Sequence, residues 1–70
     1  MKYTVTTARL GYKNNLTREQ MGFLMIQAEM ECWDGLERYR RIAEAMDRLG
    51  GNPKTYQVVT AHGDTVERAE

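Results

Sequence analysis

The stretch TREQMGFLMIQAEMECWDGLERYRRIAEAMDRLGG, residues 17–51, decides the fold, because half of the 70-residue chain lies in it without a proline. Thr17 and Gln20 have the spacing of a capping box, which marks the start of a helix. Two glycines close the stretch and a proline follows shortly after them, which is typical of a helix C-terminus. We therefore expect a helical segment over residues 17 to 49.

One face of this segment is apolar along its whole length. At about 100° per residue, the apolar residues that recur with helical spacing fall in a single band. Such a band predicts the face that packs against a sheet. We expect the core to include Leu24, Ala28, Cys32, Leu36, Tyr39, Ile42 and Met46.

A second apolar stripe lies nearly opposite the first and is confined to the first half of the segment. It consists of Phe23, Ile26, Met30 and Trp33. Three interpretations are open: the chain covers both stripes itself, a second copy covers this one in a homodimer, or a different protein binds it. Exposed apolar patches of this size mark interaction sites, and too little chain remains outside the helices to cover both sides. We expect at least two of the four residues to contact another polypeptide.

The middle of the segment carries signals for and against a break. Asp34 and Gly35 interrupt it, and Asp34 with Glu37 repeats the capping-box spacing. A continuous helix would be roughly 50 Å long, whereas a compact chain of this length is only about 28 Å across. The apolar band nevertheless continues without a change of phase, as in one straight helix. We favour a kink or break at Asp34-Gly35.

The flanking segments read as strands. Residues 2 to 8 alternate, and RLGYKNN after them suggests a bulge or the end of that strand. Residues 55 to 61 and, less strongly, 64 to 68 follow the helix as a hairpin with His62-Gly63 at its turn, which would place Val59 opposite Val66. A short C-terminal helix is the competing interpretation of the last segment. The expected fold is one α+β domain over residues 1–70, a small β-α-β(-β) unit with a two- or three-stranded sheet.

The composition narrows the class of protein. Ten basic and ten acidic residues cancel, so no net field draws the chain to nucleic acid or membrane. A single cysteine and a single histidine cannot form an intrachain disulfide or a four-ligand zinc site. The first residues lack the apolar core of a signal peptide, and no stretch is apolar enough to span a bilayer. We expect a cytoplasmic protein without metal or cofactor.

The only basic cluster is Arg38, Arg40 and Arg41, in ERYRR. Arginines at this spacing can contact phosphates, so the alternative function is a small dimeric regulator that binds nucleic acid through this helix face. Acidic residues are interleaved with the arginines, which is the pattern of a solvated helix surface held by internal ion pairs.

No catalytic motif surrounds the residues that could carry chemistry. Cys32 falls within the main apolar band, and His62 and Asp64 lie where a turn is expected. The sequence therefore favours a non-enzymatic protein–protein interaction module. From the small size and the absence of a catalytic motif, we expect an inhibitor of the phage or mobile-element type that binds and blocks a larger host complex, such as a defence nucleoprotein.

Overall fold

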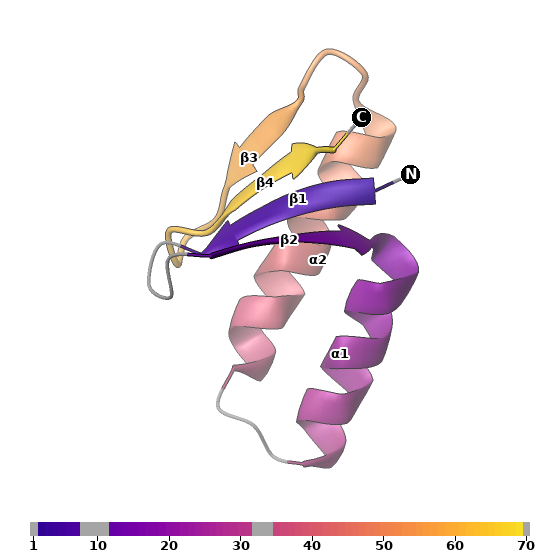
Figure 1. Cartoon of the computed structure of the whole chain (residues 1–70), viewed down its shortest axis with the longest axis vertical. Coiled ribbons are helices and arrows are strands. Elements are labelled where there is room, and N and C mark those ends of the chain that lie inside the picture. Colours follow the sequence, from indigo (N-terminus) through magenta and orange to yellow (C-terminus); the bar gives the residue numbers. More distant parts are fainter. Residues whose placement is uncertain (1, 8–11, 32–34, 70) are drawn as a thin grey trace.

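The helical segment is broken into two antiparallel helices that pack against one face of a four-stranded sheet (Figure 1). The computed structural model describes residues 2–7, 12–31 and 35–69. The α+β class and the break are confirmed, but the described residues form one strand more than the expected maximum of three. The elements in chain order are β1 (Lys2–Thr7), β2 (Tyr12–Thr17), α1 (Arg18–Met30), α2 (Leu36–Gly51), β3 (Gln57–Val59) and β4 (Thr65–Arg68).

The first and last strands pair at the centre of the sheet. The strand order is β2-β1-β4-β3, and every neighbouring pair is antiparallel. Val5 of β1 lies opposite Val66 of β4, and both side chains are buried toward the helices with Tyr3. Because successive side chains in a strand point to opposite faces, Thr4 and Thr6 lie on the other, open face. The helices therefore cover one face of the sheet only.

Strand β1 ends at Thr7, which agrees with the end of the first strand expected near RLGYKNN, but the strand β2 that follows was not predicted. Tyr12–Thr17 pairs with β1 along six residues, from Thr7 opposite Tyr12 to Lys2 opposite Thr17. On the open face, the hydroxyl of Thr4 donates to Oδ1 of Asn15 over 2.9 Å. Asparagine is depleted in strands, so the local sequence provides little indication of a strand here. The strand forms by pairing with β1.

The predicted start of the first helix is confirmed in detail. Thr17 is at once the last residue of β2 and the N-cap of α1. Its hydroxyl accepts from the backbone N–H of Gln20 over 3.0 Å, and Oε1 of Gln20 accepts from the backbone N–H of Thr17 over 2.8 Å. This capping box leaves no loop between strand and helix, so it fixes the direction in which α1 leaves the sheet.

An arginine from the last strand holds the end of α2. The guanidinium of Arg68 donates to the backbone carbonyls of Leu49, of Asn52 over 2.8 Å and of Thr55 over 2.6 Å. The last carbonyls of a helix lack partners within the helix and carry partial negative charge. A cation at this point satisfies them and joins α2 to β4.

The core lies between the sheet and the two helices. Of the predicted core residues, Ala28, Ile42 and Met46 are buried, while Leu24 and Tyr39 are partly buried against the core. Leu36 is also only partly buried, and Cys32 lies outside the described residues. Among the residues that the structure describes, the buried hydrophobic ones are Tyr3, Val5, Met21, Ala28, Ile42, Ala43, Ala45, Met46, Leu49 and Val66.

The β3–β4 hairpin is present, but its register differs by one residue from the expected one. Val58, not Val59, lies opposite Val66. Thr60 and Asp64, just outside the two strands, close a loop of three residues, 61–63: Gly63 N–H donates to the Thr60 carbonyl over 2.9 Å, and Thr60 N–H donates to the Asp64 carbonyl over 2.8 Å. Gly63 has a φ of 84°, the left-handed conformation that closes such a loop. The competing interpretation, a C-terminal helix, is wrong.

Candidate protein-binding face

Helix α1 carries an exposed apolar stripe on the side that faces away from the core. Phe23 is 64% exposed, Ile26 56% and Met30 78%. We call these three residues the outer face of α1. Met21 and Ala28, on the opposite side of the same helix, are fully buried.

The position of α1 in the fold explains this exposure. Helix α1 packs against α2 on one side and contacts β2 at the edge of the sheet. Figure 1 shows that the two helices also extend beyond the strands at the end where the chain passes from α1 to α2. No described element lies across the outer face, so water meets it directly.

The outer face is large enough to form the centre of an interface. If each side chain presents roughly 200 Å² when fully exposed, the three exposed fractions correspond to about 400 Å² of mainly apolar surface. The largest apolar patch on a monomer is typically about 300–600 Å² and is often functional. A standard interface buries about 800 Å² per partner, so the outer face could supply about half of the area that one partner buries.

The borders of the outer face are polar. Glu19 lies one turn before Phe23 on the same side of the helix, and Gln27 and Glu29 flank the stripe. All three are exposed. A polar rim around an apolar centre is the usual anatomy of a protein–protein interface.

The fourth predicted partner-binding residue, Trp33, lies outside the described residues. The exposure of Phe23, Ile26 and Met30 agrees with the expectation that their own chain does not cover the whole stripe. Their contact with a second polypeptide stays a prediction.

The three arginines of the basic cluster do not share one surface. Arg40 and Arg41 are exposed on α2, and Arg41 lies 3.2 Å from both Glu37 and Glu44. Arg40 lies 3.7 Å from Glu37. The side chain of Arg38 is only 19% exposed and points to the β3–β4 hairpin. An arginine held there does not belong to the same phosphate-contacting surface as the other two.

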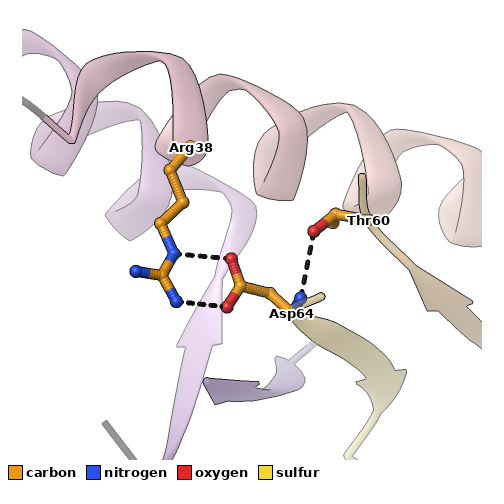
Figure 2. Close-up of polar contacts among 3 residues, drawn as sticks. All are labelled: Arg38, Thr60 and Asp64. Atoms are coloured by element: carbon orange, nitrogen blue, oxygen red, sulfur yellow. Dashed lines mark hydrogen bonds and ion pairs between the residues drawn. The ribbon is translucent and has the colours of Figure 1, made fainter. Parts of the chain in front are cut away.

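Arg38 forms an internal ion pair with Asp64 (Figure 2). Its Nε and Nη2 atoms donate to the two carboxylate oxygens over 2.7 and 2.6 Å, and the Asp64 side chain is completely buried. The backbone N–H of Asp64 donates to the hydroxyl of Thr60 over 3.1 Å. These contacts join the first turn of α2 to the loop of the hairpin.

The Arg38–Asp64 pair was not predicted from the sequence, because the two residues lie 26 positions apart. One signal was available. Arg38 lies four residues before Ile42 and seven before Ala45, on the side of α2 that is buried. A charged residue on a buried helix face needs a partner of opposite charge, and Asp64 is that partner.

The residues considered for catalysis have other surroundings. Both oxygens of the Asp64 carboxylate are engaged by Arg38, whereas His62 is exposed in the loop. Within residues 2–7, 12–31 and 35–69, no three histidine, cysteine or acidic side chains gather as a metal site would require. No helix in that part of the chain is long and apolar enough to cross a membrane.

Comparison of the chain with family models, with curated proteins and with solved structures gives no match.

Proposed function

We propose that this protein is a non-enzymatic protein–protein interaction module that binds a partner protein through the outer face of α1. The observation that carries the proposal is the unbroken exposure of Phe23, Ile26 and Met30 along one side of a well-capped helix. Phenylalanine and methionine suit this role, because an aromatic ring adds a large apolar contact and methionine adapts to the shape of a partner.

A comparison with the other helix supports the proposal. The side of α2 that faces water carries Glu37, Arg40, Arg41, Glu44 and Arg48, and all of them are exposed. The outer face of α1 has the same relation to the core but is apolar at its centre. Three large apolar side chains that are mostly in water contribute little to the stability of the fold, and a partner that covers them would account for their presence.

The test is a single substitution on the outer face with a matched control. Phe23→Asp places a charge within the stripe, whereas Gln27→Asp places the same charge on its border. We expect Phe23→Asp to weaken association at least about thirtyfold, the loss typical of an interface hot spot. We expect Gln27→Asp to bind like the wild type.

Two measurements cover the two classes of partner. Analytical ultracentrifugation over a concentration series detects self-association, and affinity capture followed by mass spectrometry detects another protein. The far-ultraviolet circular dichroism of both variants should match that of the wild type, because exposed positions change stability by only about 0.5 kcal/mol. The proposal is wrong if the Phe23→Asp variant still binds the partner of the wild type. It is also wrong if the wild type sediments as a monomer and the Phe23→Asp variant is unfolded.

An inhibitor of a larger host complex is the narrower form of this function. It stays a prediction, supported by the small size of the chain together with the apolar outer face. The nucleic-acid alternative would have to act through Arg40 and Arg41, because Arg38 is paired with Asp64. Phosphate contacts give a steep loss of binding with added salt, whereas binding through the outer face should change little.

A further inference from the structure

Strand β3 is an edge strand whose free side presents backbone hydrogen-bonding groups. It pairs with β4 alone among the described strands. Two bonds determine which groups face β4: Thr60 N–H donates to the Asp64 carbonyl, and Arg68 N–H donates to the Tyr56 carbonyl. Because the direction alternates along an antiparallel strand, the N–H and C=O groups of Gln57 and Val59 point away from β4. They form a free edge to which another strand can add.

A groove runs beside this edge. Helix α2 supplies one wall with Arg41, Glu44, Ala45 and Arg48, and β3 supplies the other with Val58 and Val59. The volume of the groove is about 200 Å³, which is enough for one or two side chains of a bound peptide. The small side chain of Ala45 keeps the space open, and Val58, which is half-buried on the side of β3 that faces α2, offers apolar surface beside it.

The charge of the groove is positive. Arg41 lies 3.2 Å from the carboxylates of Glu37 and Glu44, so its charge is largely balanced within α2. Arg48 is exposed and, within the part of the chain that the structure describes, no carboxylate lies within ion-pair distance of it. An acidic side chain in the groove would supply the missing partner.

We propose that the groove binds an extended, acidic segment of another protein, which adds to β3 as a further strand. In this mode the backbone bonds to Gln57 and Val59 give affinity, and the groove selects alternate side chains. An apolar side chain would enter beside Ala45, and a carboxylate would meet Arg48. A second copy of this chain fits less well, because pairing two β3 edges would bring a second Arg48 to the same edge.

This surface is independent of the outer face of α1. The strand order places β3 at one edge of the sheet, while α1 contacts β2 at the other. In Figure 1, β3 and α1 lie on opposite sides of the molecule. A failure of one site in an experiment therefore says nothing about the other.

The first experiment is a titration of the uniformly ¹⁵N-labelled full chain with a blocked peptide of alternating valine and glutamate. We expect saturable shifts at the amides of Gln57 and Val59 and at Nε of Arg48. The same peptide with lysine in place of glutamate should bind about tenfold more weakly. Shifts confined to α1, or the absence of saturation at millimolar peptide, would overturn the proposal. So would β3 shifts that appear with protein concentration alone, because they would indicate self-pairing.

Two variants test the two halves of the recognition. Val59→Pro removes an N–H that points away from β4 and breaks no bond to β4. An edge strand tolerates proline at such a position. The variant should bind the peptide about tenfold more weakly. Arg48→Glu should lower it similarly and should reverse the preference between the glutamate and lysine peptides. Arg40→Glu, a change at another exposed arginine of the same helix, is the control and should bind like the wild type. Unchanged affinity in both test variants would refute the proposal, and unchanged β4 amides show that each variant is folded.

Discussion

Removal of one member of the Arg38–Asp64 pair should destabilise the protein more than any other single change at its polar residues. The carboxylate has no exposed surface, the arginine side chain is 19% exposed, and two hydrogen bonds of 2.7 and 2.6 Å join them. Breaking a buried pair by removing one partner costs about 3–5 kcal/mol, because a charge is left buried without compensation. A domain of 70 residues has a total stability of about 3.5–10 kcal/mol. Either single variant should therefore lose about a third or more of the total stability.

The two single variants should not be equal. In Asp64→Ala, the orphaned guanidinium is at the surface edge and can reach water, so we expect a cost near the lower end, about 3 kcal/mol. In Arg38→Ala, the carboxylate that remains is completely buried, and we expect a larger cost. The double variant Arg38→Met/Asp64→Leu should recover most of the loss, because apolar residues of similar volume often replace a buried pair at little cost.

Urea denaturation followed by circular dichroism measures these changes, and the single variants Arg38→Met and Asp64→Leu complete a double-mutant cycle with the wild type and the double variant. The control is the exposed pair Arg18–Asp47, whose side chains are 42% and 59% exposed at a distance of 2.9 Å. Its removal should change the free energy of unfolding by less than about 1 kcal/mol. If both buried-pair variants cost less than about 1 kcal/mol, or if the double variant is as unstable as the sum of the singles, the reasoning is wrong.

Two further changes test the joints of the fold. Arg68→Met removes the cation from the carbonyls of Leu49, Asn52 and Thr55 but keeps most of the side-chain volume. It should lower the free energy of unfolding by about 1–3 kcal/mol in a urea titration. A loss below about 0.5 kcal/mol would show that water takes the place of the guanidinium at these carbonyls. Gly63→Ala should lower the free energy of unfolding by about 1–2 kcal/mol because its φ is 84°. Gly63→Asn should cost less, and equal urea midpoints for alanine and glycine would contradict the assigned loop.

The features that followed from the sequence are those encoded within one or two helical turns. The capping box of Thr17 and Gln20 located the start of α1, and the spacing of the apolar band placed Ala28, Ile42 and Met46 in the core. The same geometry placed Phe23, Ile26 and Met30 on the opposite, exposed side. Periodicity succeeds here because one helix face is decided by residues three and four positions apart.

The features that escaped depend on residues far apart in the chain. Asn14 and Asn15 resemble a turn, and they join a strand only because β1 supplies six consecutive partners. Arg38 and Asp64 are 26 positions apart, so no local pattern connects them. The predicted hairpin register was wrong because a three-residue loop and a two-residue turn can contain the same glycine. Only the backbone conformation distinguishes the two.

The requirements of folding do not explain the apolar composition of the outer face of α1. A small domain of two helices on one sheet needs one buried side on each helix. Helix α2 has such a side, and its remaining surface carries charged residues. Helix α1 buries Met21 and Ala28, yet it keeps Phe23, Ile26 and Met30 in water. Polar residues at those three positions would leave the core contacts unchanged and would improve solubility. The apolar choice therefore contributes little to the described fold, and this agrees with the proposal that a partner protein covers these three residues.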